Sequence, residues 1–151
     1  ANNDPAADYP AALLGLGAVV ITTSREISAD DFFTDMFETA LQEGEIITAV
    51  RFPKAVKAGY SKFPNPASRY AIVGVFAAET ASGMRIAVTG AGPCVFRATD
   101  IEAALGTALS SCAELPAPAA DGLNSDMHAS AEYRAHLVTV MAARAIAEAI
   151  G

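Results

Sequence analysis

The feature that most constrains the fold is a hairpin pattern between residues 71 and 89. Residues 71–79 form an apolar stretch rich in β-branched and aromatic side chains, which is typical of a strand. Ser82 and Gly83 follow as turn-forming residues, and residues 84–89 return as a second apolar stretch. We therefore predict two antiparallel strands joined by a tight turn, with apolar side chains on both faces of the first strand.

The remaining periodicities extend this hairpin to an α+β fold. Strand patterns come first in the chain and helix patterns come afterwards, which favours an antiparallel sheet with helices on one face. With 52% hydrophobic residues among 151, the chain can bury a core in one or two small domains. Besides the hairpin, we expect helices over residues 8–16, 101–109 and 130–150, a short helical segment from Asp30, and strands over residues 18–22, 46–52 and 60–63.

Residues 46–52 predict a regular strand that stops at Pro53. Successive side chains of a strand point to opposite faces of its sheet. Regular alternation places one set of side chains on one face, namely Ile46, Thr48, Val50 and Phe52, and the other set on the opposite face, namely Ile47, Ala49 and Arg51.

Charge and hydropathy argue against nucleic acid and membranes as partners. The net charge of −7 disfavours nonspecific binding to nucleic acid or anionic lipid, because Lys and Arg dominate such binding. No apolar run reaches the roughly 20 residues that a membrane-spanning helix needs. The best apolar run, residues 11–22, is short and interrupted by Gly15 and Gly17. We therefore expect no membrane span.

Cysteine and histidine spacing predicts no metal site. Cys94 and Cys112 are far apart and lack the CxxC spacing of zinc and iron–sulfur sites, so we interpret them as reduced thiols of a cytoplasmic protein. His128 and His136 are eight residues apart and lack the i, i+4 spacing of a helical metal pair.

No catalytic motif stands out in the sequence. Residues 90–92, Gly-Ala-Gly, lack the third glycine of a dinucleotide-binding loop, because Val95 occupies its place and Pro93 removes an amide. We interpret this segment as the exit of the hairpin. No catalytic residue is therefore predicted.

Two polar clusters are interpreted as helix starts. Ser125, Asp126 and His128 lie too close together for a catalytic triad and are expected to cap the last helix. Asp30 and Asp31 are interpreted as a solvated helix start, with two acidic groups at the positive end of the helix dipole.

The opening run, residues 1–8, has two interpretations on physical grounds. Short polar side chains and free amides ahead of a helix can hold a polar cofactor. Alternatively, Asp4 and Asp8 cap and charge the start of that helix. The run has no initiator Met and is similar to the end of a loop, so we expect the chain to be a fragment of a longer protein.

The same run resembles a flavin motif of the medium subunits of molybdenum hydroxylases, the family that includes xanthine and carbon monoxide dehydrogenases. That motif reads Gly-Gly-Ser-Leu-Ala, two variable residues and Asp-Pro-Ala-Ala-Asp, and its second part matches residues 4–8. Residues 31–33 are similar to a "DFF" segment of that family, and residues 43–53 are similar to the strand that follows this segment. Residues 60–63 are similar to its Tyr-x-Lys-Leu. Residues 66–71 depart from its Arg-x-Gly-Asp-Phe-Ala pattern.

The resemblance implies three cofactor-binding residues. The second aspartate of the family motif contacts FAD and falls on Asp8. An aliphatic residue beside the flavin corresponds to Ile47, and a lysine that reaches the flavin corresponds to Lys62. On the residues alone, Ile47 would equally suit a core strand and Lys62 a strand edge.

The resemblance also implies an architecture. Residues 1–54 would be the end of the second FAD-binding subdomain, and residues 55–151 a small C-terminal domain with a three-stranded antiparallel sheet and helices. The glycine-rich loops that hold the FAD pyrophosphate in that family do not occur in these residues. We therefore expect residues 1–151 alone to bind FAD weakly.

By resemblance, the complete subunit passes electrons from [2Fe–2S] clusters through FAD to an external acceptor. The clusters belong to an iron–sulfur small subunit and the molybdenum cofactor to a large subunit, and both would be partners of this chain. Two alternatives remain: a subunit-docking module without cofactor contact, tested with Tyr133 and Leu137, and an unrelated stand-alone α+β domain.

Overall fold

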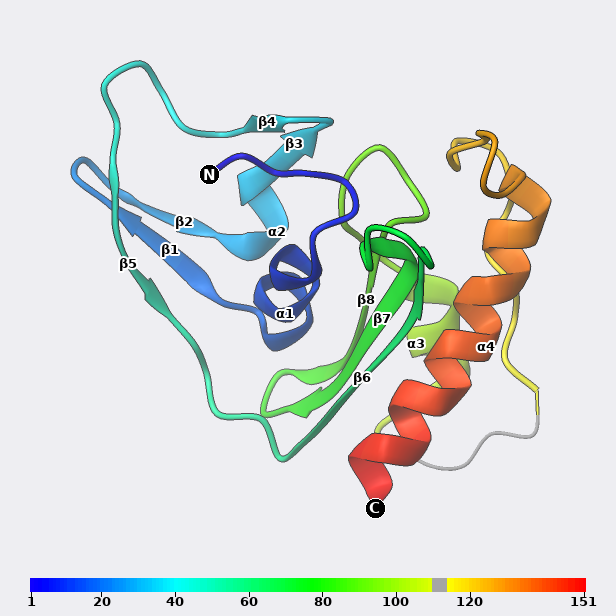
Figure 1. Ribbon diagram of the computed structural model, residues 1–151. Helices are drawn as coiled ribbons and strands as arrows, with labels where there is room; N and C mark the ends of the chain where they lie inside the picture. The colour runs from blue at the N-terminus through cyan, green and yellow to red at the C-terminus, as the bar shows by residue number, and fades with distance from the viewer. Residues whose placement is uncertain (110–113) are drawn as a thin grey trace.

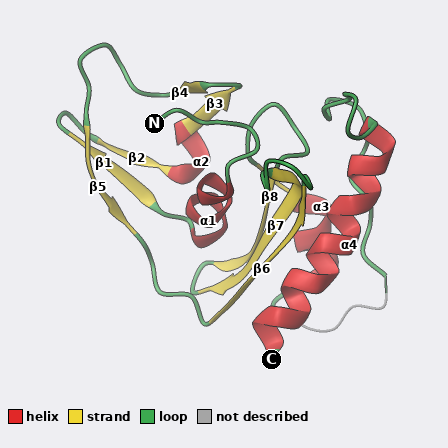
Figure 2. Ribbon diagram, in the orientation of Figure 1, coloured by secondary structure: helices red, strands yellow, loops and turns green. Residues whose placement is uncertain are grey.

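A computed structural model describes residues 1–109 and 114–151. Figure 1 shows helix α1 (Asp8–Leu16) between two antiparallel sheets, with helix α4 (Ala131–Ile150) on the far side of the second sheet. The predicted α+β class is confirmed, and the secondary structure is mapped in Figure 2. Helices α1 and α4 match the predicted helices over residues 8–16 and 130–150 closely.

The first sheet has the strand order β2-β1-β5 and is antiparallel throughout. Its strands are β1 (Val19–Thr22), β2 (Glu26–Ser28) and β5 (Ile47–Arg51). Two of these strands were predicted from the sequence, whereas the three-residue β2 was not.

The predicted alternation of residues 46–52 is wrong at one position. Ile21 pairs with Ala49 but its neighbour Thr22 pairs with Ile47, so Thr48 is an extra residue in β5. This β-bulge shifts the register by one residue, and both Ile47 and Val50 pack against the core. The two side chains were expected on opposite faces.

A short helix and a small hairpin follow the first two strands. Helix α2 (Ala29–Phe32) has Ser28 as its N-cap, and strands β3 (Phe33–Asp35) and β4 (Glu38–Thr39) pair antiparallel. The expected short helix is therefore present, one residue earlier than predicted.

The second sheet has the order β6-β7-β8-β9 and contains the predicted hairpin. Strands β7 (Ala71–Thr80) and β8 (Gly83–Thr89) form that hairpin, and β6 (Lys57–Pro64) pairs along the free edge of β7. The three long strands match the expected three-stranded sheet, and the two-residue β9 (Phe96–Arg97) adds a fourth strand.

Helices cover both faces of the second sheet, so the prediction of helices on one face is wrong. Helix α4 and the short α3 (Thr99–Leu105) pack on the face that carries Val73, Val75 and Ile86. Helix α1 lies on the opposite face, against β7 and β8. The strand β7 is therefore buried on both sides, which explains its two apolar faces.

The C-terminus of α3 and the N-terminus of α4 differ from the sequence-based expectation. Helix α3 ends at Leu105 rather than residue 109, because Gly106 takes a positive φ of 71° that ends the helix. Ser130, not the cluster at residues 125–128, caps α4 by accepting a hydrogen bond from the amide of Tyr133. Asp126 instead pairs with Arg134 inside that helix at 2.7 Å.

Within the described ranges, no helix is both long enough and apolar enough to cross a bilayer.

Candidate functional site

Asp8 and Lys62 meet at the start of helix α1. Lys62 Nζ donates to Asp8 Oδ2 at 2.8 Å, across 54 residues of sequence. Tyr60 Oη donates to Asp8 Oδ1 at 2.6 Å, so each carboxylate oxygen has one donor from strand β6. The structure therefore brings two of the three sequence-predicted site residues into one cluster, here called the Asp8 cluster (Asp8, Tyr60, Lys62).

The strand geometry of β6 explains why Tyr60 and Lys62 act on the same carboxylate. Residues two apart in a strand point to the same face. Ser61, between them, points to the opposite face and contacts Met141 of α4. Tyr60 and Lys62 therefore face α1, where Asp8 occupies the first helical turn.

Electrostatics keep the Tyr60 hydroxyl protonated. Burial raises the pKa of Tyr60 far above its ordinary value, and the hydrogen bond to the Asp8 carboxylate raises it further. A protonated phenol can only support the carboxylate as a donor here, and the ammonium group of Lys62 supplies the compensating charge.

A pocket of about 330 Å³ lies beside this cluster and contains Ile47. Asp8 and Lys62 do not line it, although the neighbours Ala7 and Tyr9 do. The structure thus places Ile47 at the pocket and the Asp8 cluster next to it. The lining combines the opening run with apolar side chains, namely Ala1, Asn2, Asn3, Asp4, Ala7, Tyr9, Pro10, Leu13, Val20, Phe32, Phe33, Ile47, Val50 and Tyr70.

Asn3 is a polar wall residue that the sequence analysis did not single out. Its Nδ2 donates to the carbonyl oxygens of Asp35 at 2.7 Å and Glu38 at 2.8 Å, which ties the opening run to the β3–β4 hairpin. Its Oδ1 is buried and has no hydrogen-bond partner among the described residues. A buried acceptor without a donor is unusual in a native protein, so this atom suits a donor group of a bound molecule.

Neither Asp4 nor Asp8 caps helix α1, although Asp8 places an acidic group in its first turn. Asp4 Oδ1 accepts from the amide of Ala6 in a turn before α1, while the N-cap Ala7 has no side-chain cap. Asp8 lies inside the first turn and pairs with Lys62 rather than capping the helix. The carboxylate of Asp8 is still half-exposed, at 49% of its side-chain surface.

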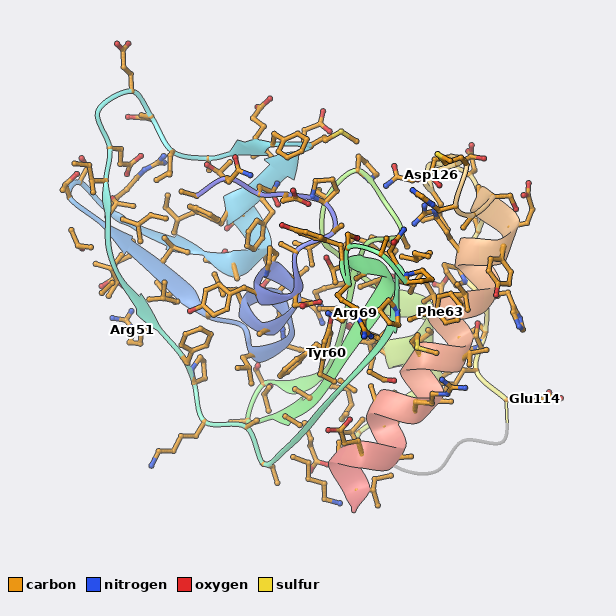
Figure 3. All side chains as sticks on the ribbon, in the orientation of Figure 1. Arg51, Tyr60, Phe63, Arg69, Glu114 and Asp126 are labelled. Carbon is orange, nitrogen blue, oxygen red and sulfur yellow. The ribbon has the colours of Figure 1, made fainter. Side chains whose placement is uncertain are left out.

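A second pocket of about 400 Å³ lies between residues 64–72 and the segment before α4. Arg134 lines it and donates to the carbonyl oxygens of Ile72 at 2.7 Å and Gly90 at 3.0 Å. Asp126, labelled in Figure 3 near the start of α4, holds the same guanidinium. Asp126 thus serves to anchor α4, as a salt-bridge partner and not as a cap.

Asp30 is ion-paired rather than solvated alone. Arg85 donates to Asp30 at 2.7 Å, and Arg97 lies 3.7 Å from the same oxygen. Asp31, in contrast, accepts a hydrogen bond from the hydroxyl of the N-cap Ser28. The prediction of a helix start holds, and the pair Arg85–Asp30 additionally links α2 to the second sheet.

Of the two cysteines, the structure describes only Cys94. Burial raises the pKa of the Cys94 thiol, and the carboxylate of Asp35 raises it further. Cys112 lies outside the described residues. Among the residues that the structure describes, no group of three His, Cys, Asp or Glu side chains could hold a metal ion.

Comparison with known families gives two matches that together cover most of the chain. The family model described as "FAD binding domain in molybdopterin dehydrogenase" matches residues 1–55. The model described as "CO dehydrogenase flavoprotein C-terminal domain" matches residues 58–149.

Similar proteins include several medium subunits. The nicotine 6-hydroxylase medium subunit of Paenarthrobacter nicotinovorans is 35% identical, over 99% of this chain and 58% of the relative. The carbon monoxide dehydrogenase medium chain of Afipia carboxidovorans is 30% identical with the same coverages. This chain therefore spans about 58% of the length of these curated relatives.

Solved structures show the same arrangement. A chain of quinoline 2-oxidoreductase from Pseudomonas putida 86 superimposes with a TM-score of 0.80 at 27% identity, covering 99% of this chain and 57% of that one. Carbon monoxide dehydrogenase from Hydrogenophaga pseudoflava gives a TM-score of 0.79 at 28% identity, covering 99% and 58%.

Proposed function

Because the chain belongs to the family of FAD-binding medium subunits of molybdenum hydroxylases, we propose that it forms the flavin-facing C-terminal part of such a subunit. Because the chain belongs to this family, it is not an unrelated stand-alone α+β domain. The observation that carries the proposal is the Asp8 cluster. The family resemblance assigns Asp8 and Lys62 to the flavin through two separate motifs. In the structure these two side chains contact each other at 2.8 Å.

The residues present fit part of a flavin in their polarity. The pocket at Ile47 has apolar walls for an aromatic ring system and a buried acceptor, Asn3 Oδ1, that lacks a donor. Its volume of about 330 Å³ is small against the ligand pockets of proteins, so it would hold only part of FAD. The Asp8 carboxylate beside it can accept a hydrogen bond from the same cofactor.

Each residue has a separate role in this proposal. Asp8 would accept a hydrogen bond from the cofactor, Lys62 would supply positive charge near it, and Ile47 would contact the ring face. Bound FAD would supply the redox chemistry between [2Fe–2S] clusters and an external acceptor. The chain's own residues bind and orient the cofactor and shield it from water.

The partners and location follow from the same family. We propose an iron–sulfur small subunit and a molybdenum-cofactor large subunit as partners, in the cytoplasm, and residues 1–54 and 55–151 as parts of two domains. The name of the relative, carbon monoxide dehydrogenase medium chain, implies that it has partner chains, which supports this proposal. The junction between the two matched regions, residues 1–55 and 58–149, supports this boundary.

A titration tests the proposed cofactor role. The complete polypeptide that carries residues 1–151 would be titrated with FAD as the wild type and as Asp8→Asn and Lys62→Met. We expect each variant to weaken binding about tenfold, the equivalent of one charge-assisted hydrogen bond. The exposed pair Arg51–Glu26 offers a control, since Glu26→Gln removes an ion pair whose residues neither line the pocket nor belong to the Asp8 cluster. Unchanged FAD affinity in both variants would contradict the proposal.

A further inference from the structure

We infer that Tyr60 is a positioning residue of the cofactor site, which holds the Asp8 carboxylate in one orientation before the cofactor binds. The inference rests on the proposed contact between Asp8 and FAD and adds a residue to it. Tyr60 does not line the pocket at Ile47, so its influence would pass through Asp8.

The Asp8 carboxylate needs such support because it is half-exposed. A free aspartate in the first turn of a helix can change its rotamer, and ordering it on cofactor binding would lose entropy. Tyr60 holds Oδ1 at 2.6 Å and Lys62 holds Oδ2 at 2.8 Å, so both oxygens are fixed. Each carboxylate oxygen can accept two hydrogen bonds, which leaves acceptor capacity for a ligand.

Lys62 and Tyr60 contribute different effects to the Asp8 carboxylate. Lys62 is a flexible side chain that contributes charge, whereas the tyrosine ring has only two side-chain torsions and fixes direction. The pKa of Tyr60 is raised by its burial and by Asp8, so the hydroxyl keeps its proton for the carboxylate. Tyr60 therefore orients Asp8 without neutralising it.

Tyr60 is itself held rigidly by the sheet. Its ring lies 6.3 Å from that of Phe76, its cross-strand partner, and packs against the same core cluster as helix α1. Figure 3 labels Tyr60 between α1 and the edge of the second sheet. Binding sites built on rigid strands are held more closely than sites on loops.

Gly74 makes room for the hydroxyl. It is the cross-strand partner of Lys62 on β7, and a Cβ at this position would overlap the Tyr60 hydroxyl. Its backbone does not need a positive φ, so the absent side chain is the evident reason for glycine. Glycine at this position is thus tied to the tyrosine hydroxyl, which supports a specific role for that group.

A double-mutant cycle between Tyr60 and Asp8 tests the inference. The complete polypeptide would be prepared as Tyr60→Phe, Asp8→Asn and the double variant, and the FAD dissociation constant measured by quenching of flavin fluorescence. We expect Tyr60→Phe to weaken binding about five- to tenfold, somewhat less than one hydrogen bond to a charged group. In the Asp8→Asn background, the same change should have less than about a twofold effect, because the two residues act as one unit. Tyr133→Phe is the matched control, since this tyrosine is exposed on helix α4 and lies outside the Asp8 cluster.

The outcomes separate this inference from the proposed function. If Asp8→Asn leaves the dissociation constant unchanged, the proposed contact between Asp8 and FAD is wrong. If Asp8→Asn weakens binding while Tyr60→Phe does not, or if Tyr60→Phe acts equally in both backgrounds, the positioning role is overturned. An equal effect in both backgrounds would indicate a packing role alone.

A second variant covers the case in which Tyr60→Phe folds poorly. Gly74→Ala keeps the hydroxyl but forces it to move. We expect a loss of FAD affinity similar to that of Tyr60→Phe, and no further loss when the two changes are combined. Two additive losses, or full affinity in Gly74→Ala with the fold intact by thermal unfolding, would overturn the inference.

Discussion

Arg85 of strand β8 donates a hydrogen bond from Nε to the carbonyl oxygen of Leu14 in helix α1, at 2.8 Å. The two residues are 71 positions apart in sequence. The carbonyl belongs to the last turn of α1, where it also accepts a hydrogen bond from the amide of the C-cap Gly17 at 3.2 Å. The same guanidinium reaches Asp30 of α2, so one buried arginine joins the first part of the chain to the second sheet.

We therefore expect Arg85→Met to lower the free energy of unfolding by about 2 kcal/mol, because the change removes a buried hydrogen bond from a charged group and the ion pair with Asp30. Urea unfolding followed by circular dichroism measures this. Arg51→Met is the matched control, since its pair with Glu26 is exposed to solvent and should contribute much less to stability. Equal effects of the two substitutions would contradict the role of Arg85.

Gly59 lets helix α4 lie against strand β6. A Cβ at Gly59 would overlap the backbone oxygen of Ala145, which cannot rotate away. We expect Gly59→Ala to lower the free energy of unfolding by about 2–3 kcal/mol through overpacking. Gly92→Ala is the control, because its Cβ would meet only the flexible Phe96 ring at 3.4 Å and the Cys94 carbonyl at 3.5 Å. Urea unfolding curves of both variants check the prediction.

The hydrogen bonds of Glu45 lead us to expect that the protein loses stability in acid. The hydrogen bond from Arg25, with further bonds from Thr22 and the Gln42 amide, lowers the pKa of Glu45 to about 2. Because the folded-state pKa lies below the unfolded one, this stabilisation is complete above about pH 4.5 and is lost as pH falls toward 2.

The difference in urea midpoint between wild type and Glu45→Gln should therefore be largest near pH 6 and shrink below pH 4.5. Glu43→Gln is the control, since Glu43 is exposed in the same turn. A difference that stays constant from pH 6 to pH 3 would show that the carboxylate charge is unimportant.

The docking role can be tested on helix α4. Tyr133 is 44% exposed and packs edge-on against Phe63, whereas Leu137 is buried in the core. Leu137 is therefore unsuited to the docking test expected from the sequence, and Leu137→Ala should lower the free energy of unfolding by about 2–5 kcal/mol.

Tyr133→Glu tests contact with the iron–sulfur subunit without disturbing that core. We expect the charge to weaken capture of the subunit in a pull-down, while Ala143→Glu, on an exposed position of the same helix, leaves capture intact. Full capture by Tyr133→Glu would place the interface elsewhere.

Local pattern predicted most of the secondary structure but not the long-range contacts. The hairpin of residues 71–89 was recognisable because β-branched residues and a Ser-Gly turn are local signals. Both faces of β7 are apolar, which indicates that helices cover both sides of the sheet. The prediction of helices on one face did not take this pattern into account.

The β-bulge at Thr48 could not be read from alternation, because it depends on the register with β1. The contact between Asp8 and Lys62 depends on how α1 packs on the second sheet, so family resemblance named both residues but not their pairing. The position of Tyr60 in the Asp8 cluster could have been predicted from the sequence, because Tyr60 lies two residues before Lys62 on the same strand face.

The most direct test of the central claim is a crystal structure of the complete polypeptide with FAD bound. We expect a polar atom of the flavin within about 3.2 Å of the Asp8 carboxylate, with Tyr60 still bonded to Asp8 and the side chain of Ile47 against the ring. A flavin bound away from the Asp8 cluster and the pocket at Ile47 would contradict the account.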